Sequence, residues 1–126
     1  PVSCSIGKAV LDVIEEEQLQ KNAKLVGNFL KNELHKLQEK FTIIGDVRGA
    51  GLFLGIELND AEKTPLPEQA SYLVNRMKDY GVLMSTDGLD HNVIKIKPPM
   101  VFTGEHAKEL VFYLKKVMAE DFMLSF

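Results

Sequence analysis

The chain has 126 residues, of which 45% are hydrophobic and 26% charged, and its 15 basic and 18 acidic residues leave a net charge of −3. These values are typical of one globular domain and provide no basic field that would attract nucleic acid. No apolar run reaches the ~18–20 residues that a membrane-spanning helix needs. The single cysteine, Cys4, excludes an internal disulfide, and no histidine spacing is typical of a zinc site.

Two amphipathic helices are predicted in the first third of the chain. Over residues 3–17 the apolar residues recur at helical spacing, so this helix has one face to bury. Over residues 20–39 a second apolar stripe alternates with lysines and glutamates, which form a solvated face. The two stripes consist of Ile6, Ala9, Val10, Val13 and Ile14, and of Val26, Phe29, Leu30, Leu34 and Leu37.

The period of the apolar residues then changes to that of β-strands. Alternate residues from Leu52 to Leu58 are apolar, as a strand with one buried side requires. Ile43 and Ile44 predict a shorter strand before it, and the glycines of residues 48–51 predict a bend between the two. We therefore expect two strands next to each other in the sequence.

The second half of the chain predicts a loop over residues 59–67, a helix over 68–80, short strands over 82–84 and 93–97, and turns over 85–92. Thr103 is a good N-cap for a last helix that reaches Met118. The order α-α-β-β-α-β-β-α predicts an α+β fold in which a small, mostly antiparallel sheet is covered by helices. Residues 1–126 are expected to form one domain.

Lys95 and Lys97 are the best candidates for binding. Residues two apart on a strand lie on the same face, so both ammonium groups project away from Ile94 and Ile96, which point toward the core. Two such groups form a plausible anion site. The alternative is an edge strand whose lysines only discourage aggregation, and the residues alone leave both interpretations open.

Other polar clusters point to structure more than to chemistry. The segment from Arg48 to Gly51 lacks the third glycine and the following helix of a dinucleotide-binding motif, so we interpret it as a bend that begins at Arg48. Residues 85–88 supply two hydroxyls and a carboxylate but no base to activate them, which favours a capped turn. No catalytic, cofactor-binding or metal-binding residue is predicted.

Three segments carry a family resemblance: residues 1–4 (PVSC), residues 44–58 (IGDVRGAGLFLGIEL) and residues 94–99 (IKIKPP). In their order and spacing they resemble the class III aminotransferases, which depend on pyridoxal phosphate (PLP). The resemblance implies that residues 1–126 are the C-terminal small domain of a fold-type I PLP enzyme. Pro1 would then end a motif that leads in from a large PLP-binding domain, which agrees with a chain that begins without Met or leader.

The resemblance also implies a branch of the family. Residues 83–88 and 92–100 are similar to those of phospho-lyases, which eliminate phosphate from amino-phosphates such as phosphoethanolamine. Many transaminases of the family carry an arginine in place of Lys95, and this arginine grips the substrate carboxylate. The implied substrate contacts are therefore Lys95 first, Lys97 second, and Arg48 in a mainly structural role. There are two alternatives. One is an amino-acid transaminase, and the other is a non-catalytic module that binds a small anion or a partner.

The resemblance also implies where the cofactor binds, which partners the chain has and where it is located. The lysine that anchors PLP lies in the large domain, so the 126 residues alone should be inactive. The expected partners are the chain's own large domain, a second copy in a homodimer or homotetramer, and a small amino-phosphate or amino-acid substrate, with neither nucleic acid nor membrane. The expected location is intracellular, either cytoplasmic or mitochondrial.

Overall fold

The computed structural model describes all of residues 1–126 and contains five helices and one four-stranded sheet. The helices are α1 (Val2–Glu16), α2 (Leu19–Lys40), α3 (Pro67–Asp79), α4 (Gly104–Met118) and α5 (Asp121–Leu124). The strands are β1 (Ile44–Ala50), β2 (Phe53–Leu58), β3 (Ser85–Asp87) and β4 (Val93–Ile96). None of the helices combines the length and the apolar character that crossing a membrane requires.

The sheet has the order β1-β2-β4-β3, and every neighbouring pair is antiparallel. β1 and β2 form a hairpin, and β4 inserts between β2 and the edge strand β3. The register places Gly55 of β2 opposite Arg48 on one side and opposite Lys95 on the other. This arrangement confirms the predicted α+β fold with a small antiparallel sheet.

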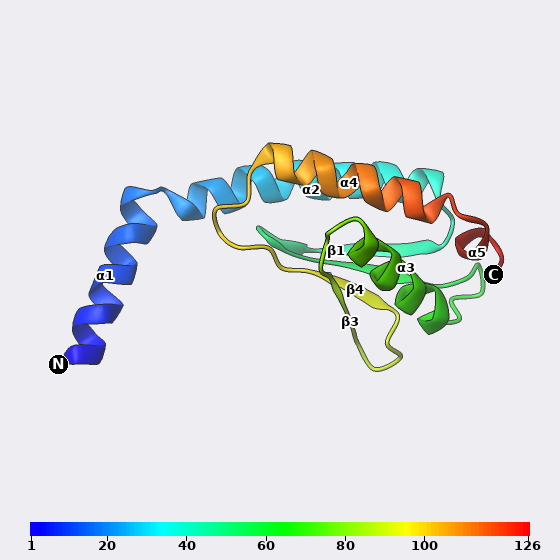
Figure 1. The fold of residues 1–126 in the computed structure, drawn as a ribbon, viewed down its shortest axis with the longest axis horizontal. Helices are drawn as coiled ribbons and strands as arrows, with labels where there is room; N and C mark the ends of the chain where they lie inside the picture. The colour runs from blue at the N-terminus through cyan, green and yellow to red at the C-terminus, as the bar shows by residue number, and fades with distance from the viewer.

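Helices cover one face of this sheet. α2 packs on β1 and β2, α4 lies beside α2, and α3 lies beside α4 against β2, β3 and β4 (Figure 1). Apolar residues of the helices meet alternate residues of the strands in one core, because successive strand residues point to opposite faces. The fully or almost fully buried members include Leu30, Leu34, Leu54, Ile56, Leu73, Met77, Ile94, Ile96, Leu114 and Met118.

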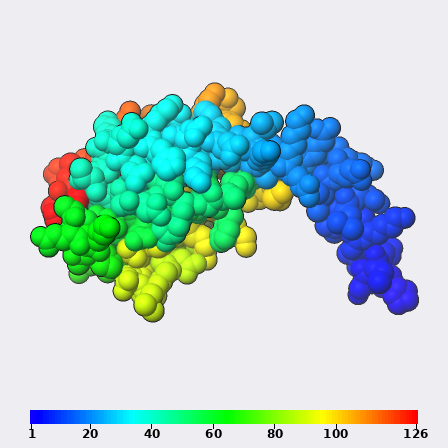
Figure 2. Space-filling model, turned by 180° about the vertical axis from the view of Figure 1, so that it is seen from behind, coloured from blue at the N-terminus to red at the C-terminus, as the bar shows by residue number.

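Helix α1 is present as predicted, but residues 1–126 do not bury its apolar side. The helix projects away from the body of the fold at the N-terminal end of α2 (Figures 1 and 2). None of its residues is buried. The large apolar residues that it exposes are Val2, Ile6, Val10, Leu11 and Val13.

The bend predicted for residues 48–51 lies further along the chain. β1 continues through Arg48 and Gly49 to Ala50, and the turn is at Gly51 and Leu52. Gly49 stays in the ladder at φ 126°, a conformation that side chains other than glycine rarely adopt. A Cβ atom there would lie 2.1 Å from the carbonyl oxygen of Phe53. Because residue 49 is glycine, β1 can continue through this conformation. The preference of glycine for turns had predicted a bend here instead.

The predicted strand at residues 82–84 is wrong, and the strand lies in the polar residues that follow. Val82 and Met84 are half-buried against the core in the connection after α3. β3 instead uses Ser85–Asp87, which pair with Lys95, Ile94 and Val93. Hydrogen bonding to β4, and not the apolar character of residues 82–84, therefore determines which residues form the strand. The short helix α5 was not predicted either.

The predicted N-cap of the last helix is confirmed. The Thr103 hydroxyl accepts a hydrogen bond from the backbone N–H of His106 at 3.3 Å, and the Thr103 N–H donates to His106 Nδ1 at 3.1 Å. This reciprocal pair satisfies two donors that the first turn would otherwise leave unpaired. The capping box fixes the start of α4 directly after the segment that leaves β4.

Candidate functional site

The face of the sheet that no helix covers carries the charged residues predicted for binding. Arg48, Gly55 and Lys95 lie opposite one another on β1, β2 and β4. A hollow of ≈ 460 Å³ opens over this row. Its lining includes Arg48, Phe53, Gly55, Asp87, Val93 and Lys95.

Gly55 makes this hollow possible. It lies in the middle of a strand, where a larger residue would place its side chain between Arg48 and Lys95. A Cβ atom at this position would lie 3.3 Å from Cγ1 of Val93 and 4.0 Å from the carbonyl oxygen of Ile94. The glycine therefore keeps the floor of the hollow at backbone level and leaves room for a small molecule between the two cations.

Lys95 lies at one side of the hollow, with its side chain 36% exposed. Its Nζ donates to Oδ2 of Asp87 at 2.9 Å, and the other carboxylate oxygen of Asp87 accepts from the N–H of Gly88, also at 2.9 Å. The bond from Lys95, followed by the bond from Gly88, lowers the pKa of Asp87 from its usual range. Asp87 is therefore ionised at neutral pH and forms a charged pair with Lys95.

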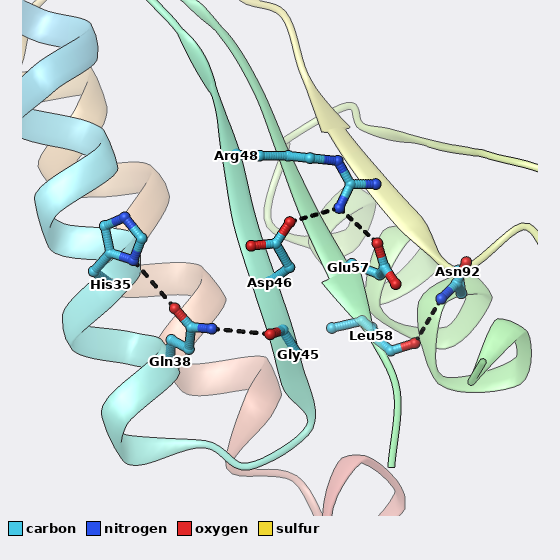
Figure 3. A network of polar contacts seen from close by, with 8 residues as sticks. All are labelled: His35, Gln38, Gly45, Asp46, Arg48, Glu57, Leu58 and Asn92. Atoms are coloured by element: carbon cyan, nitrogen blue, oxygen red, sulfur yellow. Dashed lines mark hydrogen bonds and ion pairs between the residues drawn. The ribbon is translucent and has the colours of Figure 1, made fainter. Parts of the chain in front are cut away.

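Arg48 lies on the opposite side and is held by two carboxylates (Figure 3). Its Nη1 donates to Oδ2 of Asp46 at 2.8 Å and to Oε2 of Glu57 at 2.5 Å. These hydrogen bonds, with that to Asp46 the stronger cause, raise the pKa of Arg48. Asp46 is on β1 and Glu57 on β2, so the guanidinium links the two strands of the hairpin.

The edge of the site is fixed by two further polar contacts shown in Figure 3. The side-chain amide of Asn92 donates to the carbonyl oxygen of Leu58 at 2.9 Å and is buried. Gln38 of α2 donates to the carbonyl oxygen of Gly45 at 3.1 Å. The first contact ties the start of β4 to the end of β2, and the second ties β1 to the helix layer. Together they hold the strands that carry Arg48 and Lys95 in register.

Lys97 is not part of the hollow over Gly55. It is exposed, and its Nζ lies 5.8 Å from the ring centroid of Phe53. Together with Lys95 it lines a second hollow, also of ≈ 460 Å³, where the chain leaves β4 near the end of α3 and the start of α4. The structure thus brings Lys95 and Arg48 to one hollow and separates Lys97 from Arg48.

Two members of the site were not anticipated from the sequence. The sequence pattern predicts a capped turn at Asp87 and gives Gly55 no role beyond its place in an alternating strand. Their roles depend on cross-strand register, which places Gly55 opposite Lys95 and brings Asp87 within reach of its ammonium group. A hairpin assigned to residues 85–96 would have been the signal for Asp87. The single cysteine, Cys4, is exposed on α1 and does not line this hollow.

Comparison with known proteins identifies the family. The model of the family "Aminotransferase class-III" matches residues 1–118. An alanine–glyoxylate aminotransferase 2-like protein of Drosophila melanogaster is 49% identical over 121 residues, which are 94% of this chain and 24% of that protein. Ethanolamine-phosphate phospho-lyase homolog 1 of Caenorhabditis elegans is 38% identical over 122 residues, 94% of this chain and 26% of that protein.

Solved structures agree with this result. A phospholyase from Arthrobacter in complex with phosphoethanolamine superposes with a TM-score of 0.90 at 36% identity, covering 95% of this chain and 29% of that one. A PLP-bound amine transaminase from an uncultivated Pseudomonas species has a TM-score of 0.81 at 32% identity, covering 94% and 27%. The chain thus spans only 24% to 29% of the length of these four proteins. By sequence and by fold, the chain belongs to the class III aminotransferase family.

Proposed function

We propose that residues 1–126 form the C-terminal small domain of a PLP-dependent enzyme, and that the hollow over Gly55 receives the anionic group of its substrate. The observation that carries this proposal is the position of Lys95. Its ammonium group borders a hollow of the right size for a small molecule, on the one face of the sheet that helices leave open. A charge-assisted hydrogen bond from such a group is the usual way to hold a phosphate or carboxylate.

The cofactor itself is proposed to bind outside these residues. PLP withdraws electrons from the substrate carbon that bears the amine. The only lysine that lines the hollow over Gly55 is Lys95, and its ammonium is already bonded to Asp87. Lys95 therefore does not fit the role of cofactor anchor, and we propose that its part is to bind and orient the substrate. The remaining three quarters or so of the relatives' length leaves room for a large cofactor-binding domain.

We propose phosphate elimination from an amino-phosphate, such as phosphoethanolamine, as the reaction. In this reaction a base removes a proton from the carbon that bears the amine, and the electrons of that C–H bond form a C=C bond. The C–O bond on the neighbouring carbon breaks, and the phosphate leaves with its electron pair. Lys95 would bind the phosphate oxygens as a point charge with freely rotating donors, whereas an arginine would present a planar fork suited to a carboxylate. The phospholyase bound to phosphoethanolamine and the Caenorhabditis phospho-lyase homolog support this choice.

Amino-acid transamination is the second candidate. Two relatives at 49% identity, from Drosophila melanogaster and Arabidopsis thaliana, are named as alanine–glyoxylate aminotransferases or homologues of them. The products separate the two reactions. Release of phosphate and ammonia from phosphoethanolamine supports the lyase, and transfer of the amino group to glyoxylate or pyruvate supports the transaminase.

The test of the binding role uses the complete protein. Lys95→Ala is expected to lower kcat/KM for the phospho-substrate about 10- to 150-fold, because a hydrogen bond to a charged group is worth roughly 1.5–3 kcal/mol. Lys97→Ala is the matched control, since it removes the same charge two residues away, outside the hollow over Gly55. Normal kinetics for Lys95→Ala, or a greater loss for Lys97→Ala, would contradict the proposal.

We also propose that the complete protein forms a homodimer or homotetramer and lies in the cytoplasm or the mitochondrion. The Arabidopsis relative is named as mitochondrial, which supports the second location. The exposed apolar side of α1 supports a further packing partner, and the chain's own large domain is the partner that we propose. A purified complete protein without the visible absorption of bound PLP would favour a non-catalytic binding module instead.

A further inference from the structure

Asp87 lies where it can control the ammonium group that the proposed function needs. We propose that Asp87 is an internal counter-ion of Lys95, which holds the ammonium beside the hollow and competes with the substrate's anionic group for it. Asp87 would then set how tightly the site binds anions. This inference rests on the proposed function of the hollow over Gly55.

The position of the Asp87 carboxylate does not depend on Lys95 alone. Asp87 pairs with Val93 across the ladder, so it lies diagonally from Lys95, whose own partner is Ser85. The Gly88 N–H holds one carboxylate oxygen at 2.9 Å, and the other oxygen receives the Lys95 ammonium at 2.9 Å. The backbone therefore keeps the carboxylate oriented, and the flexible lysine side chain is the member of the pair that can move.

The charges around the hollow show why such a counter-ion matters. Arg48 is bonded to Asp46 and Glu57, and Lys95 is bonded to Asp87. An entering anion thus meets two cations that are paired with three carboxylates. To bind, the anion must draw the Lys95 ammonium at least partly away from Asp87 or share the ammonium with Asp87. Sharing is possible because an ammonium group has three donors.

The neutral variant Asp87→Asn should therefore bind anions more tightly. The asparagine keeps the shape and an oxygen for the Gly88 N–H, but it lacks the charge that competes for Lys95. We expect about 5-fold tighter binding of phosphate, and about 2-fold tighter binding of a monoanion such as acetate, because the attraction of the released ammonium scales with the charge of the ligand. Asp87→Glu retains the charge and should resemble the wild type.

The experiment measures the affinity of the complete, PLP-saturated protein for inorganic phosphate by isothermal titration calorimetry, so that the cofactor already fills its own phosphate site. The proteins compared are the wild type, Asp87→Asn, Asp87→Glu, Lys95→Ala and the double variant Asp87→Asn/Lys95→Ala. If Asp87 competes for the ammonium, Lys95→Ala costs more affinity in the Asp87→Asn background than in the wild type. A simple surface charge would give the same cost in both.

The outcomes separate this inference from the proposed function. An unchanged phosphate affinity of Lys95→Ala in the wild-type background would overturn the proposed binding role, and this inference with it. A loss that is equal in both backgrounds, or an Asp87→Asn variant with wild-type affinity, would overturn the counter-ion role alone. Tighter binding by Asp87→Asn together with a larger cost of removing Lys95 would support it.

Discussion

At the scale of single residues, the two cations beside the hollow differ in how firmly they are held. Arg48 donates to carboxylates on both strands of its hairpin, whereas Lys95 has one carboxylate partner and a flexible stem. A guanidinium held by two carboxylates helps to stabilise the hairpin. An ammonium held by one carboxylate can turn toward a ligand. This difference supports the proposed binding role of Lys95 and the proposed structural role of Arg48.

Gly55 provides a test at the same scale. Gly55→Val places a branched side chain over the floor of the hollow, and we expect kcat/KM of the complete protein to fall at least about 10-fold because the substrate's anionic group is displaced. The fold should survive, since valine suits a strand and the nearest atom, Cγ1 of Val93, is at 3.3 Å from the new Cβ. Gly55→Ala fills less space and should lose less activity. Normal kinetics for a folded valine variant would show that the substrate does not enter this hollow.

At the scale of elements, β2 supplies both the core and the site through its alternation. Leu54, Ile56 and Leu58 point into the helix layer and are almost fully buried, while Gly55 and Glu57 lie on the open face. The strand therefore positions the site because its other side is locked in the core. A shift of one residue would move every core side chain of β2 to the open face.

Leu54→Ala measures how much this strand depends on the core. The side chain is 3% exposed, so we expect a loss of about 2–5 kcal/mol in the free energy of unfolding, from lost burial and the cavity left behind. Leu89→Ala is a control, because Leu89 is 95% exposed and should change stability by about 0.5 kcal/mol or less. Urea denaturation of both variants provides the comparison. Equal midpoints would show that the assigned buried face of β2 is wrong.

At the scale of the whole molecule, a polar cluster joins α3 to the C-terminal end. Arg76 donates to both carboxylate oxygens of Glu120, at 2.8 Å from Nη2 and at 3.0 Å from Nε, and the Tyr72 hydroxyl donates to the same carboxylate. The bonds from Arg76, and then from Tyr72, lower the pKa of Glu120. Because the folded-state pKa lies below the unfolded one, the stabilisation is complete above the unfolded value and is lost as the pH falls through the folded value.

The pH dependence of stability tests this cluster. Glu120→Gln should melt at a lower temperature than the wild type at pH 7, because it lacks the charge that binds Arg76. The difference should narrow as the pH falls below the ordinary glutamate pKa of about 4.3, because the wild-type carboxyl gains its proton as the pH passes through its lowered folded-state pKa. Thermal melts at several pH values provide the measurement. A difference that is constant with pH would show that the charge of Glu120 does not matter for stability.

The location of the cofactor anchor is a second test at this scale. Borohydride reduction of the complete, PLP-bound protein, followed by peptide mapping, should find the single stoichiometric pyridoxyl label outside residues 1–126. The reason is that Lys95, the one lysine of the hollow over Gly55, is bonded to Asp87. A specific label on any lysine of residues 1–126 would contradict the proposal that the cofactor is anchored in a separate large domain.

The sequence alone determined the features that depend on local periodicity. The helical stripes predicted α2, α3 and α4, and the alternation from Leu52 to Leu58 predicted β2 with its correct buried side. The Thr103 cap was also predicted, because capping uses residues within one turn. Lys95 could be assigned to the face opposite Ile94 and Ile96, since a strand places alternate residues on opposite sides.

Only the tertiary structure decided what surrounds these residues. The pairing of β3 with β4 brings Asp87 to Lys95, and the insertion of β4 beside β2 brings Gly55 between Lys95 and Arg48. These contacts join residues 7 to 40 positions apart, counting from 48 to 55 and from 55 to 95. Strand order and register depend on how the whole core packs, which no local pattern specifies. The row of Arg48, Gly55 and Lys95 on the open face exists only once they are set.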